Sequence, residues 1–180
     1  MNETAFQSPV LWLDRGMARL FLVLFLSLVA SLTGFAADST LSVISGDTTL
    51  TLTADQLKAL PHIELTATEP HERKDHLYSG VPVRDLLARA GAPLGDKLRG
   101  KALQLAVLVR SKDGYSTLFA LAEFDDSFSN RTILLADSED GKPLAANSAP
   151  LRLVVPGDRR AARWARMVTS LEVVSPGATR

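Results

Sequence analysis

Short apolar segments that alternate with polar residues and are separated by glycine turns constrain the fold of this chain most strongly. Stretches 41–45 and 48–52 flank Gly46-Asp47, and stretches 102–110 and 116–121 flank Asp113-Gly114. Alternation at period two gives a strand one buried and one exposed face, and such turns join antiparallel neighbours. Further strands are predicted at 63–68, 131–136, 151–156 and 168–174. The sequence therefore predicts a fold in which strands outnumber helices.

Two short helices are predicted between these strands. Thr53 and Gln56 have the spacing of a capping box in "TADQLKAL", and Pro61 ends that element. In "GVPVRDLLARAG", Pro82 stands at a helix start, apolar residues recur at helical spacing, and Gly91 follows as a C-terminal cap. No repeat of about 20 to 50 residues recurs. We therefore expect one domain, residues 37–180, with a β-rich α+β fold.

The N-terminal 36 residues resemble an export signal rather than part of a folded domain. Arg19 precedes an uncharged apolar run, 20–37, and cleavage after Ala36 would place Gly34 and Ala36 where small side chains are required. This pattern predicts a signal peptide at 1–36, with Met1 or Met17 as the start, and a periplasmic or secreted domain. The alternative is an uncleaved membrane anchor, because 18 uncharged residues approach the length of a membrane-spanning helix. In both cases the domain lies outside the cytoplasm.

Composition removes several classes of function. The chain has 20 basic and 20 acidic residues, so charge offers no argument for nucleic-acid binding. It has no cysteine, which excludes disulfides, thiolate metal ligands and a cysteine nucleophile. Neither a G-x-S-x-G elbow nor a phosphate-binding glycine loop occurs. Hydrolase and nucleotide-binding functions therefore have no support in the sequence.

Five stretches in chain order resemble a known family. They are "ADQLKALP", "YSGVPVRDLLARAG", "DGYSTLFALAEF", "ILLADSEDGKPLAANSAPLRLVVPGD" and "RWARMVTSLEVV". They resemble the oxidoreductase molybdopterin-binding domain of the sulfite oxidase type, particularly its small exported single-domain members. The resemblance covers about residues 41–174. It implies a mixed, β-rich α+β fold with a few short helices, in which loops at one end of the sheet surround a pterin-type cofactor.

One segment departs from the family pattern. In catalytic relatives, the segment after the first strand of this region carries a cysteine that ligates molybdenum, whereas this chain has "TEPHERKDH". We predict that the stretch 66–80 is a solvated or ligand-facing loop, in which His71 and Arg73 contact the ligand. Its histidines and acids are competent metal ligands, but Arg73 and Lys74 would repel a cation, so no metal site is assigned.

Arginines supply the other candidate ligand contacts. Arg152 interrupts an apolar strand, where its guanidinium would bind a phosphate or pair with a carboxylate on a neighbouring strand. Arg159, Arg163 and Arg166 would share one face if their segment were helical, either as an anion site or as a solvated face. Tyr115 follows a turn that the family places near its pocket, or packs on the sheet. The candidate cofactor-binding residues are Arg152, Tyr115, His71, Arg73, Arg159 and Arg163.

Two functions remain open. The first is an exported, non-catalytic module that binds a small anionic or pterin-like ligand, with a membrane-bound redox or sensor partner. The second is a molybdopterin-dependent oxidoreductase whose metal has a non-cysteine environment. The resemblance implies molybdopterin as cofactor, whereas the absence of cysteine argues against molybdenum and favours the binding module.

Overall fold

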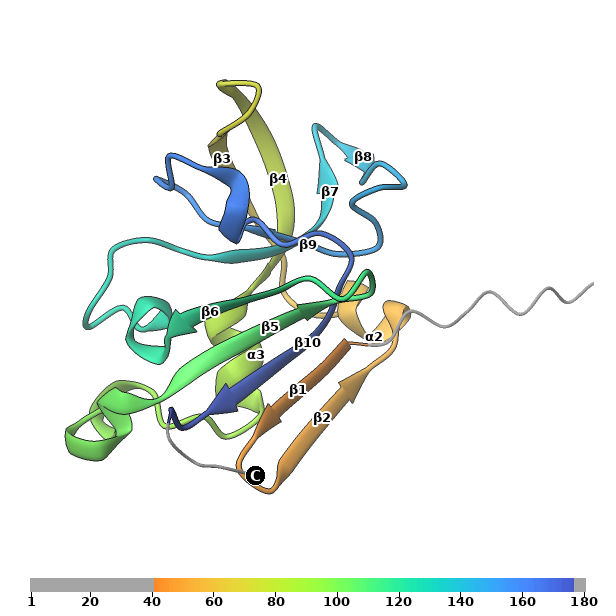
Figure 1. The fold of residues 1–180 in the computed structure, drawn as a ribbon. Helices are drawn as coiled ribbons and strands as arrows, with labels where there is room; N and C mark the ends of the chain where they lie inside the picture. The colour runs from red at the N-terminus through yellow and green to blue at the C-terminus, as the bar shows by residue number, and fades with distance from the viewer. Residues whose placement is uncertain (1–40, 177–180) are drawn as a thin grey trace, which may run out of the picture. The chain divides into compact units, whose positions relative to one another are not determined.

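The computed structural model describes residues 41–176, and the predicted signal peptide lies outside the described residues. Two sheets form the framework (Figure 1). The first contains β2 (Thr48–Leu52), β1 (Leu41–Ser45), β10 (Val168–Val174), β5 (Ala106–Ser111) and β6 (Ser116–Ala120), in that order. The second contains β3 (Ile63–Glu69), β4 (Lys74–Pro82), β7 (Leu134–Glu139) and β8 (Lys142–Pro143), and β9 (Arg152–Val154) also pairs with β7. The mixed first sheet, the antiparallel second sheet and the few short helices confirm the predicted α+β fold.

The first sheet contains the two predicted hairpins. β1 pairs with β2 and β5 with β6, both antiparallel, and Gly46 and Gly114 adopt the positive φ angles that their turns require. β1 and β10 are parallel. β5 begins at Ala106, later than predicted, because residues 100–104 form the 3-10 helix η3 (Gly100–Gln104). The side chain of Leu103, which the alternation placed in this strand, is exposed.

The second sheet corrects the predicted loop over residues 66–80. β3 and β4 pair in register from Ile63 with Gly80 to Glu69 with Lys74, so only residues 70–73 form a turn. The prediction was wrong because apolar residues do not mark the buried face of β4 near the turn: His76 and Tyr78 are buried, whereas the apolar Leu77 between them is exposed. The stretch is therefore a strand whose buried face carries a histidine and a tyrosine.

At position 80, β4 lies so close to its neighbour β7 that only glycine fits. The register of the β4–β7 pair shifts between Ser79 and Gly80. A Cβ atom at Gly80 would lie 2.2 Å from the carbonyl oxygen of Leu135 and 2.6 Å from the Cα of Ala136. This close approach brings β7, and the acidic residues at its end, beside β4.

Both predicted helices are present. In α2 (Ala54–Lys58), Thr53 Oγ1 accepts the Gln56 N–H at 3.3 Å and Gln56 Oε1 accepts the Thr53 N–H at 2.9 Å, which confirms the capping box. α3 (Val83–Arg89) begins directly after Pro82 and contacts β1 and β4. Within residues 41–176, no helix is long and apolar enough to span a bilayer.

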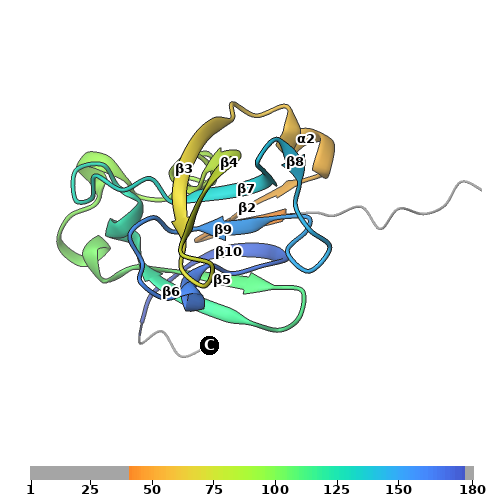
Figure 2. The ribbon, with the colours of Figure 1, turned by 90° about the horizontal axis from the view of Figure 1, so that it is seen from above.

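Within residues 41–176, the buried apolar residues form one hydrophobic cluster between these elements. The inward residues of the first sheet include Val43, Val109 and Leu171, which are fully buried. They join Leu153 of β9 and Leu86 of α3 in the same cluster. β9 lies between β7 and β10 in both views (Figures 1 and 2). This core supports the loops that carry the candidate site.

Candidate functional site

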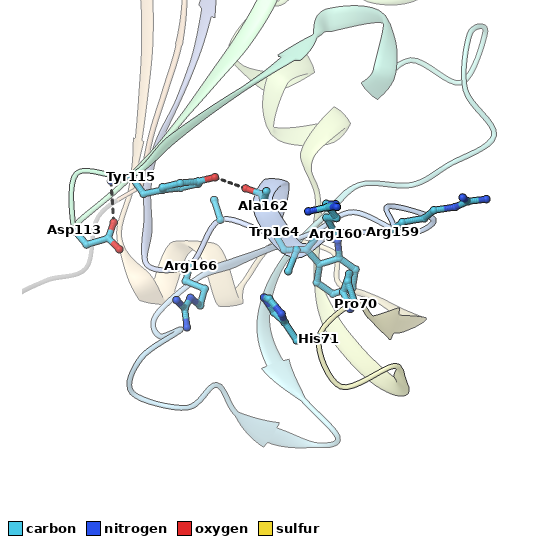
Figure 3. Close-up of a pocket in the computed structure, with 11 residues that line it drawn as sticks. Pro70, His71, Asp113, Tyr115, Arg159, Arg160, Ala162, Trp164 and Arg166 are labelled. Atoms are coloured by element: carbon cyan, nitrogen blue, oxygen red, sulfur yellow. Dashed lines mark hydrogen bonds between the residues drawn. The ribbon is translucent and has the colours of Figure 1, made fainter.

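A cleft of about 510 Å³ collects half of the predicted ligand residues. The β3–β4 turn contributes Pro70 and His71, and the β5–β6 turn contributes Asp113 and Tyr115 (Figure 3). The rest of the wall comes from the segment after β9, namely Arg159, Arg160, Ala161, Ala162, Trp164, Ala165 and Arg166. The cleft thus lies where three chain segments far apart in sequence converge.

The cleft is rich in uncommitted positive charge. Arg159, Arg160 and Arg166 are exposed, and none of them makes an ion pair with another residue of the described range 41–176. The acid in the wall, Asp113, accepts the backbone N–H of Tyr115 at 3.0 Å. Guanidinium groups without an acidic partner offer charge-assisted hydrogen bonds to an anion. This cleft is therefore suited to phosphate- or sulfate-like groups.

Tyr115 joins two walls of the cleft. Its hydroxyl donates a hydrogen bond to the carbonyl oxygen of Ala162, in the 3-10 helix η5 (Ala161–Arg163) (Figure 3). The side chain is 46% exposed, so the phenol borders the cleft instead of packing into the sheet. Tyr115 therefore fixes the position of η5 relative to the β5–β6 turn.

An ion-pair network outside the cleft holds the segment 159–166, which carries the cleft arginines. The Arg163 guanidinium donates to Asp158 at 2.8 Å and to Glu123 at 2.9 Å, and Arg131 donates to Glu123 at 2.7 Å and to Asp158 at 3.1 Å. Arg163 also lies 4.7 Å above the Phe119 ring. The bonds to Asp158 and Glu123 raise the pKa of Arg163. Arg163 is therefore an anchor of this segment, and its guanidinium is already occupied.

The segment does not form the helix on which the predicted arginine face depended. Only residues 161–163 are helical, as a single 3-10 turn. Arg159 and Arg166 line the cleft, whereas Arg163 faces its acidic partners. Arg160 joins the cleft wall, although no periodicity in the sequence singles it out.

Arg152 lies outside the set of residues that line the cleft. Its Nη2 donates to Glu69 Oε1 at 3.0 Å, and both residues are buried. The guanidinium also lies 5.7 Å from the Tyr78 ring and 5.4 Å from the ring of Trp164, which does line the cleft. Of the two predicted contacts for Arg152, the structure contains the carboxylate pair.

The β3–β4 turn places its two predicted residues differently. His71 lines the cleft, and its backbone N–H donates to Glu69 Oε2 at 2.6 Å. Arg73 is exposed, has a φ of 54° and lies outside the lining set. Burial raises the pKa of Glu69, but the N–H groups of Glu72 and His71 and the charge of Arg152 outweigh it and hold that pKa below its usual value. Glu69 is therefore ionised where it supports the turn.

A second cleft, of about 450 Å³, lies between α2 and the β7–β8 hairpin. Its wall is mainly apolar and includes Leu57, Leu144 and Leu151. None of the predicted ligand residues lines it. The first cleft is therefore the candidate site.

The donor set of the candidate cleft fits only part of a molybdenum cofactor. Imidazole and guanidinium groups suit the phosphate end of a pterin cofactor. The chain contains no cysteine, so it offers no thiolate for a metal at the other end. Among the described residues, no group of three or more histidine or acidic side chains is arranged to hold a metal ion. The cleft thus matches an anion and does not match a thiolate-ligated molybdenum.

Comparisons with known proteins agree with the fold. The model of the oxidoreductase molybdopterin binding domain family matches residues 35–178. Among solved structures, the sulfane dehydrogenase SoxCD from Paracoccus pantotrophus is similar, with a TM-score of 0.58 and 22% sequence identity over 76% of this chain. The matched region spans 38% of that SoxCD chain. No curated protein matches. The family match confirms the resemblance noted in the sequence.

Proposed function

This chain belongs to the oxidoreductase molybdopterin binding domain family, and we propose that it is a non-catalytic member that binds a small anionic or pterin-like ligand in the cleft. The observation that carries this proposal is the group of three arginines in the cleft wall that have no acidic partner within residues 41–176. Arg131, Arg152 and Arg163 are paired with carboxylates, whereas Arg99, which is exposed outside the cleft, has no ion pair within residues 41–176. The cleft differs from the rest of the described surface in that three such arginines lie in one wall. An external anion would supply the missing partner.

The absence of a thiolate supports the non-catalytic part of the proposal. Thiolate ligation tunes both the affinity and the redox potential of a bound metal, and imidazole or guanidinium cannot replace it directly. The alternative is a molybdopterin-dependent oxidoreductase with a non-cysteine metal environment. Molybdenum content and turnover distinguish the two functions.

We further propose that the domain acts outside the cytoplasm, as a periplasmic or secreted protein or on a membrane anchor. The support is the apolar run at 20–37 with its small-residue end. A membrane-bound redox or sensor protein is then the expected partner. N-terminal sequencing of the exported protein should begin at Ala37, and an intact Met1 or Met17 in the membrane fraction would favour the anchor.

Calorimetric titration with pyrophosphate, a compact and highly charged phosphate anion, tests the ligand class. Arg160→Gln removes one unpaired guanidinium and should weaken binding about tenfold, the loss expected for one charge-assisted hydrogen bond. Arg99→Gln is the matched control, because Arg99 is exposed, makes no ion pair within residues 41–176 and lies outside the cleft. Equal affinities of the two variants would show that pyrophosphate does not use the cleft.

A further inference from the structure

A network of charged side chains lies behind the cleft and holds the turn that carries His71. Glu69 Oε2 accepts the backbone N–H groups of His71 at 2.6 Å and of Glu72 at 2.8 Å. Its other oxygen accepts from Arg152 at 3.0 Å. One buried carboxylate therefore fixes the backbone of the turn from inside, and Arg152 fixes the carboxylate.

His76 attaches the same turn a second time, through a side chain. Its Nε2 lies 3.1 Å from Glu72 Oε2 and its Nδ1 lies 2.8 Å from Asp140 Oδ2. Both partners are carboxylates, which accept hydrogen bonds, so both contacts are satisfied only when both ring nitrogens carry hydrogen. Asp140 is held independently, because its Oδ1 accepts the Leu77 N–H at 3.0 Å. His76 thus links the exposed side chain of Glu72, in the turn, to Asp140, which is held from β4.

We infer that Glu69 and His76 are positioning residues for the cleft, and that protonated His76 holds the turn in the geometry in which His71 meets an anion. This inference rests on the proposed anion-binding function. His76 itself does not line the cleft. Its charge would therefore control the affinity of the cleft from outside it.

When His76 loses its proton, we expect its contact with Glu72 to break first, and the groups around the ring explain why. Three carboxylates face the ring: Asp140, Glu139 of β7 and Glu72 of the turn. Tyr78 of the same strand and the uncharged Ala67, across the β3–β4 pair, also lie beside it. Glu139 is itself engaged, since it accepts from the Tyr78 hydroxyl at 2.9 Å and lies 3.9 Å from Arg152.

The hydrogen bond to Asp140 raises the pKa of His76, burial opposes this, and the bond to Glu72 adds to the increase. After deprotonation, one ring nitrogen would carry no hydrogen and could no longer donate a hydrogen bond to the carboxylate beside it. The side chain of Glu72 is 63% exposed, so it can turn into solvent.

The first test needs no ligand. In the full chain carrying His71→Gln, which removes the imidazole next to this amide, the backbone amide signal of Glu72 should titrate with the same midpoint as the His76 ring when NMR spectra are followed from about pH 5 to about pH 9. When His76→Gln is added to this chain, the titration of the Glu72 amide should disappear. In His62→Gln it should persist, because His62 has its own acidic partner, Asp137 at 3.0 Å, outside this network. A Glu72 amide that titrates unchanged after His76→Gln is added would overturn the inference.

The second test measures pyrophosphate affinity for the wild type and for His76→Gln across the same pH range. Their ratio cancels the titration of pyrophosphate itself. We expect about a fivefold advantage for the wild type at low pH, falling to about onefold above the folded pKa of His76. Glu72→Gln, a change at an exposed side chain, should lose a similar factor at low pH only.

The two proposals fail separately. A ratio that does not change with pH, with pyrophosphate still bound, would refute the positioning role and leave the proposed function. Absence of pyrophosphate binding in the wild type would refute the proposed function, while the amide titration still decides the link between His76 and the turn.

Discussion

Replacement of Arg152 by methionine should destabilise the fold strongly. The substitution keeps an apolar stem beside Tyr78 and Trp164 but removes the guanidinium from its 3.0 Å contact with Glu69. Glu69 is only 5% exposed, so its carboxylate would remain buried without its charge partner. Loss of one partner of a buried pair costs about 3–5 kcal/mol. That is a large part of a typical free energy of unfolding of about 5–15 kcal/mol.

Urea denaturation of the full chain measures this effect, with two comparisons. Arg152→Met combined with Glu69→Gln should recover much of the loss, because the amide removes the buried charge and still accepts an N–H from the turn. Arg84→Met is a control whose partner, Asp126, is exposed, and it should cost less than about 1 kcal/mol. If Arg152→Met unfolds like the wild type but no longer binds pyrophosphate, the buried pair is not structural and Arg152 serves the ligand.

Two further predictions concern the same framework. Because the pKa of His76 is raised in the folded state, its contribution to stability should be complete below its unfolded pKa of about 6.5 and lost as the pH rises through the folded pKa; the stability difference between wild type and His76→Gln should therefore shrink with rising pH, and a growing difference would contradict this sign. Gly80→Ala should cost at least about 2 kcal/mol in urea denaturation, because its Cβ would overlap the Leu135 carbonyl; a fully stable variant would show that β4 and β7 separate easily.

The sequence predicted the elements that depend on local signals. The capping box at Thr53, the start of α3 after Pro82 and the hairpin turn at Gly114 each follow from residues within a few positions of one another. The β4 strand was missed because its buried face carries His76 and Tyr78 and its exposed face includes the apolar Leu77, which hides the usual apolar alternation.

The cleft was only partly predictable, because side-chain direction depends on distant partners. Arg163 and Arg160 are close in sequence, yet Arg163 is turned away from the cleft by Glu123, 40 positions earlier. Arg152 is paired with Glu69, which lies 83 positions earlier. Composition and spacing cannot show whether an arginine pairs with a carboxylate that is distant in sequence. The contacts of each arginine therefore have to be known before a candidate ligand residue can be chosen.

The molybdenum content of the purified protein tests the central claim most directly. The full chain would be expressed while molybdopterin cofactor is supplied, and the metal measured per chain together with sulfite and sulfoxide turnover. Because the chain has no thiolate to ligate the metal, we predict protein without molybdenum and without turnover, which nevertheless binds pyrophosphate in the cleft. Stoichiometric molybdenum with reversible redox spectra would contradict the binding-module account and establish the oxidoreductase instead.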